Sequence, residues 1–308
     1  PQYRVWMQDR APPQTHYLTR AGRWVAEPSW PSEHIQTKIY HLNKTGLSEQ
    51  PGETLEIPIH TPQTLGMRQG TWCGHGVNPD APNDQREDDG CSIVFETDPL
   101  PKNVEILGAP TLDLQISADQ PNAFIVARLS EVAEDGAATR VSYGVLNLTH
   151  RDSHLNPEPL VPGQVYNVRV QLNDIAQTFR AGQRIRISLS NTMWPMFWPS
   201  PQPVTVTLLS TGSTLNLPMR KARASDDQLA PFSGPESATP QSTEVQKPAQ
   251  YVRRIERDET NNEAKVTVIA DSGMVRLSKL GWEHGSVSRQ YYTIREGDPN
   301  SAKSHQHW

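Results

Sequence analysis

The sequence predicts an all-β fold. Its 308 residues include 27 prolines and 19 glycines, and strong helix signals are few. Short runs of alternating apolar and polar residues recur along the chain, and turn segments such as "EDG" at 134–136 and "VPG" at 161–163 separate them. A two-residue period with frequent breaks is typical of an antiparallel β-sandwich or a jelly roll.

The first unit is predicted over residues 1–218. Within it, 1–45 supplies opening strands at 3–7 and 35–42, which flank the proline- and tryptophan-rich segment "GRWVAEPSWPS". The main sandwich spans 46–218 and contains, after a polar loop at 66–91, a succession of strand-like runs. In chain order these are "CSIVFET", "TLDLQIS", "AFIVARLSEV", "TRVSYGVLNLT", "VYNVRVQL", "RIRISLS" and "PVTVTLL". The segment "LNDIAQTF" at 172–179 is predicted as a short helical turn.

The composition changes after this unit. Residues 219–249 are rich in Ser, Pro, Gln and Glu and poor in large apolar residues, which predicts a linker or long loop. Residues 250–308 again contain strand-like runs, "YVRRIER", "AKVTVIA", "MVRLSKL" and "QYYTIRE". We expect a small antiparallel β extension that packs against the first 45 residues or against the sandwich.

Charge and cysteine content limit the function classes. The formal net charge is −5 with both signs interspersed, which disfavours nucleic acid as a partner. No apolar run reaches the roughly 18 residues that a membrane helix needs, and the first residues lack a signal-peptide pattern, so no membrane partner is expected. Two cysteines are too few for a disulfide framework and favour a cytoplasmic location. The chain opens directly on a strand, as a piece of a longer polypeptide would.

The heptapeptide "LTHRDSH" at 148–154 contains the residue types of a hydrolase or zinc site. In an extended chain, however, consecutive side chains point to opposite faces and cannot form a triad. His150 and His154 would lie roughly 13 Å apart at about 3.3 Å per residue, too far for one metal ion. We interpret the segment as a polar strand end that runs into a loop.

No G-x-S-x-G nucleophile elbow occurs, since "GTWCG" at 70–74 has Trp72 in the serine position. Cys73 is a conceivable nucleophile, and Cys73, His75 and Cys91 are conceivable zinc ligands. The Cys-x-His spacing is unusual for zinc and no fourth ligand is evident. Ordinary loop residues are the preferred interpretation, and neither a metal nor a cofactor is predicted.

Two segments are candidates for an interface. The acidic stretch "DQREDDG" contains Asp84, Arg86, Asp88 and Asp89, and it predicts a salt-bridged loop that joins two structural units, with a calcium site as the alternative. The segment "MWPMFWPSPQP" places Trp194, Phe197 and Trp198 among four prolines. Core burial, an interface or pocket wall, and a carbohydrate-stacking platform all remain open for these rings.

Several stretches together resemble one family. "DQREDDGCSIVFETDPL", "VEILGAPTLDLQISAD", "VARLSEVAEDGAATRVSYGVLNLTHRDSH" and "FRAGQRIRISLS" are similar, in order and spacing, to the C-terminal β-sandwich of X-Pro dipeptidyl-peptidase and cocaine-esterase-type (CocE/NonD) serine hydrolases. "GRWVAEPSWP" resembles the segment that follows the catalytic domain in those proteins. The resemblance covers residues 1–218, and the tail resembles an extension of some longer members.

The resemblance implies a galactose-binding-like jelly roll that accompanies an α/β-hydrolase domain with a Ser-Asp-His triad and a helical cap. That family transfers acyl groups to water. No catalytic residue can be assigned here, because nothing matches the elbow and the triad lies upstream of residue 1 in the resemblance. The chain is thus expected to be a noncatalytic sandwich that packs on the missing hydrolase domain and shapes its cleft. The alternative is a carbohydrate-binding module that uses Trp194, Phe197 and Trp198, and homo-oligomer assembly is a further possibility.

Overall fold

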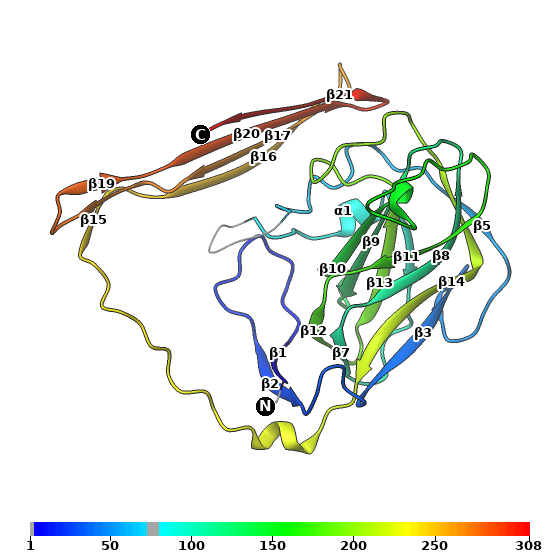
Figure 1. Cartoon of the computed structure of the whole chain (residues 1–308), viewed down its shortest axis with the longest axis horizontal. Helices are drawn as coiled ribbons and strands as arrows, with labels where there is room; N and C mark the ends of the chain where they lie inside the picture. The colour runs from blue at the N-terminus through cyan, green and yellow to red at the C-terminus, as the bar shows by residue number, and fades with distance from the viewer. Residues whose placement is uncertain (1–2, 73–79) are drawn as a thin grey trace.

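The computed structural model describes residues 3–72 and 80–308, and these form four β-sheets (Figure 1). Two sheets face each other as a sandwich, and two make up the C-terminal extension. Helix is confined, in the described part of the chain, to α1 (Arg86–Asp89) and two short 3-10 turns, η1 (Leu148–His150) and η2 (Ala224–Gln228). The prediction of an all-β sandwich is therefore confirmed.

The larger sheet of the sandwich has ten strands. In spatial order its main path is β11 (Tyr166–Gln171), β8 (Thr111–Ala118), β14 (Val206–Arg220), β7 (Val104–Gly108), β12 (Ile175–Phe179), β1 (Tyr3–Gln8) and β2 (Gly22–Glu27). The long strand β14 also pairs with β3 (Ile35–Asn43) and β5 (Glu56–Ile59), and β4 (Gly46–Ser48) pairs with β3. β1 runs parallel to β12, whereas β14 is antiparallel to each of its partners.

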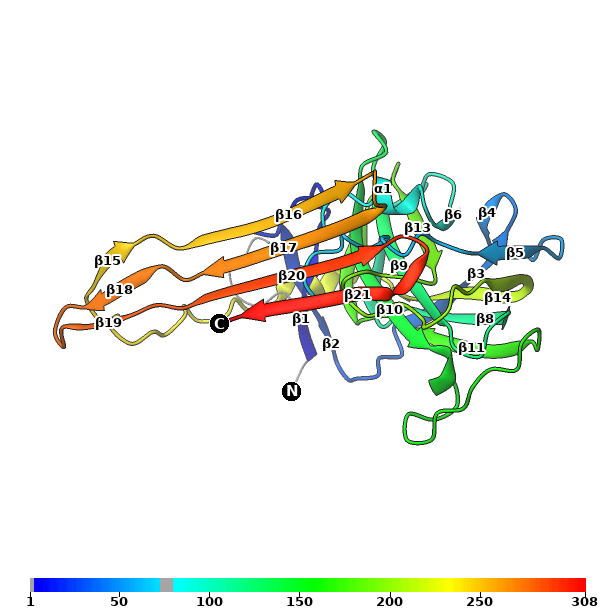
Figure 2. The same cartoon turned by 90° about the horizontal axis from the view of Figure 1, so that it is seen from above.

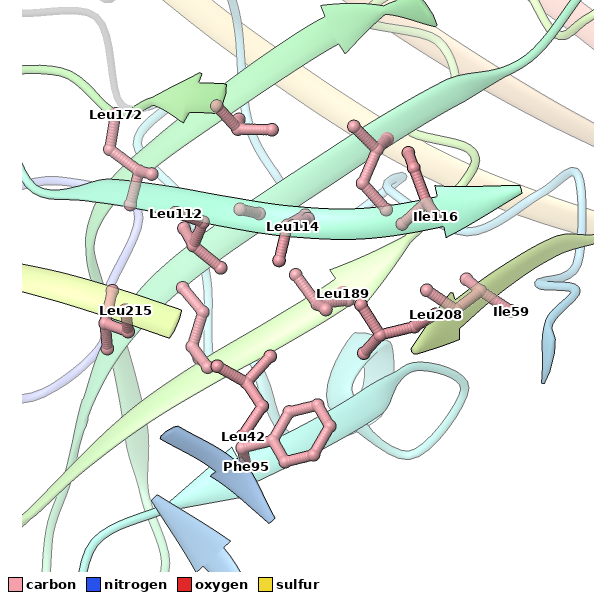
Figure 3. Packing of buried hydrophobic residues seen from close by; sticks show 14 of the residues in the cluster. Leu42, Ile59, Phe95, Leu112, Leu114, Ile116, Leu172, Leu189, Leu208 and Leu215 are labelled. Atoms are coloured by element: carbon pink, nitrogen blue, oxygen red, sulfur yellow. The ribbon is translucent and has the colours of Figure 1, made fainter. Parts of the chain in front are cut away.

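The smaller sheet supplies the opposite wall. Its order is β10 (Ala138–Asn147), β9 (Phe124–Val132), β13 (Arg184–Ser190) and β6 (Ile93–Glu96). In β8 every second side chain is buried, as expected for a strand with one face on a core. Its residues Leu112, Leu114 and Ile116 pack in one cluster with Leu189 of β13 (Figure 3). This continuous apolar layer holds the two sheets together.

The outer face of the smaller sheet is covered as well. Side chains of β9 are buried on both faces, because the loop between β5 and β6, including α1, lies over the face that carries Arg128 and Ser130. The C-terminal sheet in turn lies over this loop (Figure 1). The described parts of this loop, residues 60–72 and 80–92, therefore form an internal layer between two sheets.

The C-terminal extension is a long antiparallel ribbon that projects beyond the sandwich (Figure 2). Its first part orders as β16 (Gln250–Asp258), β17 (Glu263–Asp271), β20 (Val287–Arg295) and β21 (Asp298–His307). The far part orders as β15 (Thr243–Lys247), β18 (Met274–Leu277) and β19 (Trp282–His284). Residues 230–242, between η2 and β15, are exposed and form neither helix nor strand.

The structure corrects one predicted element. Residues 175–179 form the strand β12 and not a helical turn, because they lie between β7 and β1 and hydrogen-bond to both. Tertiary pairing outweighs the local preference at this point.

One buried cluster of charges fixes the end of β14. The guanidinium of Arg220 donates to Glu27, Glu105 and Asp226 at 2.7–2.9 Å. Burial alone would lower the pKa of Arg220, but these hydrogen bonds raise it above its ordinary value. The cluster ties β2, β7 and η2 to β14.

Candidate interface over the outer face of the smaller sheet

Helix α1 directs two carboxylates onto a fully buried arginine. Asp89 Oδ1 lies 3.2 Å from Arg128 Nη2, and its other oxygen lies 2.7 Å from Arg186 Nη1. Ser188 Oγ also donates to Asp89, at 2.7 Å. The Arg128 side chain is 0% exposed, and burial lowers its pKa while the two carboxylates oppose that shift.

Asp88 completes this network. Its Oδ2 lies 3.6 Å from Arg128 Nη1 and accepts a hydrogen bond from the side-chain amide of Gln69. Burial raises the pKa of Asp88, although Arg128 and Gln69 counteract this. Arg140 donates to the Gln69 carbonyl at 2.8 Å, and burial lowers the Arg140 pKa to about 10. Buried charges at this density are stable only as a paired set.

The beginning of the helix is open to solvent. Arg86 donates to Asp84 Oδ2 through Nε and Nη2, at 3.0 and 2.7 Å. Partial burial raises the pKa of Asp84, but the hydrogen bonds from Arg86 and from the backbone of Ala138 outweigh it and hold the pKa below its ordinary value. The predicted salt-bridged loop is present, with Asp84 and Arg86 at its surface and Asp88 and Asp89 inside.

The three predicted aromatic residues have different environments. Trp194 is 1% exposed and lies between Trp198, at 5.1 Å between ring centroids, and Tyr292 of β20, at 6.2 Å. Phe197 packs against Phe124, with centroids 4.7 Å apart. Trp198 is 45% exposed, so it is the ring of this group with a largely open face. The three rings do not form one stacking platform.

Trp194 belongs instead to the contact with the C-terminal sheet. It packs in an apolar cluster with Met67 and with inward-facing residues of β17 and β20, including Val266 and Ile294. Cores of this kind, with a large aromatic residue at the centre, account for most of the stability of a domain contact.

Polar contacts flank this cluster. Tyr251 Oη donates to Asp80 Oδ2 at 2.7 Å, and Arg253 donates to the same oxygen at 3.1 Å and to the Met67 carbonyl at 3.1 Å. Burial raises the pKa of Asp80, against the effect of Arg253 and Tyr251. At the other end, Glu296 accepts hydrogen bonds from the backbone of residues 63 and 64, at 2.8 and 3.2 Å.

Sequence reasoning missed the residues that anchor this junction: Arg128, Asp80, Arg253 and Glu296. Arg128 had a recognisable signal, because it is a cation within the otherwise apolar run "AFIVARL". A charge in a strand buried on both faces requires a buried counter-charge. The partners of the other three depend on contacts between distant segments, which strand periodicity does not reveal.

A cavity of about 280 Å³ lies at the same junction. Its lining combines aromatic and charged side chains, among them Trp72, Asp80, Tyr251 and Arg253. The described lining contains no serine, cysteine or histidine.

The heptapeptide at 148–154 folds differently from the prediction. Asn147 caps the 3-10 turn η1 by accepting from Thr149 N at 3.1 Å, so the chain bends back after β10. The rings of His150 and His154 therefore approach, with their Nδ1 atoms 3.4 Å apart, and the predicted separation of roughly 13 Å is wrong. Within the described residues, no group of three or more potential ligands gathers around them or elsewhere.

The remaining predicted residues are the two cysteines and His75. Cys73 and His75 lie outside the described residues, and Cys91 is an exposed free thiol. Among the described side chains, no serine or cysteine hydrogen-bonds to a histidine ring, as a nucleophile and its base would. No helix in the described part of the chain is long and apolar enough to cross a membrane.

The fold and this junction define the class of the domain: a β-sandwich whose polar clusters stabilise its packing. Comparison with known proteins gives the family. Residues 1–228 match the X-Pro dipeptidyl-peptidase C-terminal non-catalytic domain, and the chain belongs to that family. The recognition made from the sequence motifs is thus confirmed.

Individual relatives agree with this assignment. Cocaine esterase of Rhodococcus sp. (strain MB1 Bresler) is 23% identical over 196 residues, which are 59% of this chain and 34% of that protein. An aminopeptidase from a marine sediment Thaumarchaeota archaeon has a TM-score of 0.56 at 18% identity, over 65% of this chain and 39% of its own. An α-amino acid ester hydrolase has a TM-score of 0.55 at 20% identity, over 65% of this chain and 39% of its own. The chain therefore spans about two fifths or less of these relatives.

Proposed function

We propose that this chain is the noncatalytic accessory sandwich of a CocE/NonD-type serine hydrolase, and that it packs on an α/β-hydrolase domain and shapes the active-site cleft of that domain. The observation that carries the proposal is the match of residues 1–228 to a domain described as non-catalytic. Two further facts support it: the sequence lacks a nucleophile elbow, and the relatives have more than half of their length outside the matched region.

The predicted interface residues divide into two roles in this proposal. Arg86 and Trp198 are exposed and can contact the preceding domain directly, supported by the neighbouring Asp84 and Phe197. The buried members of the predicted set contribute indirectly, because they hold the loop and the C-terminal sheet in position. These members are Asp88, Asp89 and Trp194.

We also propose that the chain has three parts. The first, residues 1–218, consists of opening strands at 1–45 and a jelly roll of the galactose-binding type at 46–218. A linker at 219–249 and a β extension at 250–308 follow. The exposed segment 230–242 supports the linker. A cytoplasmic location and homo-oligomer assembly are part of the same hypothesis.

The test compares residues 1–308 with the longer polypeptide that includes the preceding domain. Both are assayed with p-nitrophenyl esters and with an X-Pro p-nitroanilide, with and without a serine-directed sulfonyl fluoride. We expect inhibitor-sensitive turnover from the longer polypeptide and none from residues 1–308. Serine-type turnover by residues 1–308 alone would overturn the proposal.

A second measurement addresses the cleft. Trp198→Ala in the longer polypeptide should raise KM and leave kcat nearly unchanged, because the ring would contact substrate or a cleft wall without taking part in chemistry. Trp282→Ala removes another exposed indole, on β19 at the far end of the ribbon, and serves as the matched control.

A further inference from the structure

One face of the β1–β2 hairpin carries an aromatic patch, which we define as Arg4, Trp6, Trp24 and Phe232. The hairpin buries Met7 and Val25 on its other face. Trp6 and Trp24 are directly opposed across the two strands, and their ring centroids lie 5.4 Å apart. Alternation along each strand therefore places both indoles on the hairpin face opposite Met7 and Val25.

The linker extends this patch. Phe232 packs edge-on against Trp24, with centroids 4.7 Å apart, and the guanidinium of Arg4 lies 4.0 Å from the centre of the Phe232 ring. Arg4 also donates to the Ala230 carbonyl at 2.7 Å, which fixes the linker on the hairpin. Residues from opposite ends of the domain thus form one surface.

This surface remains open in the present chain. Trp24 is 40% exposed and Phe232 is 54% exposed. Clustered Trp, Tyr, Phe and Arg are the residue types that dominate the centres of protein interfaces, whereas most isolated exposed apolar side chains have no such role.

We propose that the aromatic patch is the docking surface for the catalytic domain that precedes this chain in the longer protein. This inference rests on the proposed function and names the surface by which the two domains join. More than half of the length of the relatives lies outside the matched region, so a partner of domain size is available. Any polypeptide before Tyr3 enters directly at β1, next to Arg4 and Trp6 (Figure 1).

The covalent connection strengthens this choice of occupant. A preceding domain that is tethered through β1 has a raised effective concentration at the hairpin, which lowers the affinity that stable docking requires. The interface residues predicted from the sequence do not provide an equivalent area, since Asp88, Asp89 and Trp194 are covered by other parts of this chain. The hairpin is on the same side of the sandwich as the projecting C-terminal ribbon in both views (Figures 1 and 2).

The test is oxidative footprinting of the longer polypeptide by brief hydroxyl-radical exposure and mass spectrometry. Trp282, which is 60% exposed on β19, is the internal control for Trp24. Docking should slow oxidation of Trp24 and Phe232 severalfold relative to Trp282. If Trp24 is oxidised as readily as Trp282 while the polypeptide hydrolyses esters, the docking surface is wrong and the proposed function stands. If the longer polypeptide has no serine-type activity, the proposed function itself fails.

Variants give an independent readout. Phe232→Ser in the linker and Trp24→Ser in β2 should each split the thermal unfolding of the longer polypeptide into two transitions, because the domains no longer stabilise one another. Trp282→Ser should leave the unfolding profile unchanged. Protection of Trp24 that depends on protein concentration would instead show that a second copy covers the patch, and would overturn the proposal.

Discussion

Replacing Glu131 by glutamine should stabilise the sandwich above pH 7 and have little effect below pH 4.5. Glu131 lies in β9 and is fully buried, and one of its oxygens accepts from Gln177 Nε2 at 3.2 Å. Its other oxygen, Oε1, has no hydrogen-bond partner among the described residues. Burial raises the pKa of Glu131 from 4.5 to about 7, although the positive charges of Arg10 and Arg20 partly oppose it.

The size and sign of this change in stability follow from the difference between the pKa of Glu131 in the folded and in the unfolded chain. An increase from 4.5 to about 7, at about 1.4 kcal/mol per pKa unit, corresponds to roughly 3 kcal/mol. Below pH 4.5 the carboxyl is protonated in both the folded and the unfolded chain, and stability is not reduced. Between pH 4.5 and about 7 only the unfolded chain ionises, so stability falls as pH rises, and above pH 7 the full loss is present.

The assay is urea unfolding of wild type and Glu131→Gln at pH 4, 6 and 8, followed by tryptophan fluorescence. Glutamine is a neutral mimic of the protonated acid, so the variant should exceed wild type by up to about 3 kcal/mol at pH 8 and match it at pH 4. Glu236→Gln, in the exposed linker, removes a negative charge without this burial and should show no such pH dependence. A variant that is equal to or less stable than wild type at pH 8 would refute the reasoning.

Three further substitutions test the buried charges and the docked sheet. Arg128→Met should reduce the free energy of unfolding by about 3–5 kcal/mol, measured in urea, because it removes the buried cation that Asp88 and Asp89 share; a loss below about 1 kcal/mol would show that Gln69, Arg186 and Ser188 are sufficient partners for the two carboxylates. Arg220→Met should reduce the free energy of unfolding by a similar amount, because Arg220 pairs with three carboxylates. Arg169→Met, which removes one member of an exposed ion pair, is the control and should reduce it by less than about 1 kcal/mol. Glu296→Gln should speed hydrogen exchange in β20 and β21, because it weakens the contact with residues 63 and 64; unchanged exchange would mean that the apolar cluster alone holds the sheet.

Strand periodicity predicted much of the sandwich. The predicted runs at 3–7, 35–42, 111–117 and 184–190 lie on β1, β3, β8 and β13. These strands have one face on the core, so the alternation is visible in the sequence. β2 was not predicted, because it lies in a segment that was interpreted by its tryptophans and prolines and not as a strand. β21 was not predicted, because this edge strand consists almost entirely of polar residues.

The candidate site was predictable in residue type and only partly in arrangement. The charges at 84–89 form the salt-bridged loop that the composition indicated, yet their main partner is Arg128, nearly 40 residues later in the chain. The two histidines at 150 and 154 converge because a side-chain cap bends the chain, which an extended-strand estimate cannot include. Long-range pairing and local capping are thus the two sources of error.

The pairing of β14 with β3 also has a consequence for synthesis on the ribosome. Ile35 is opposite Arg220 and His41 is opposite Thr214, so β3 must wait for most of the domain to be translated before it pairs with β14. At about 5–20 residues per second this delay lasts roughly 10–40 seconds. During that interval β3 pairs only with β4, at residues 41–43, and a preceding domain that has already folded would be the nearest surface to shield its remaining open edge.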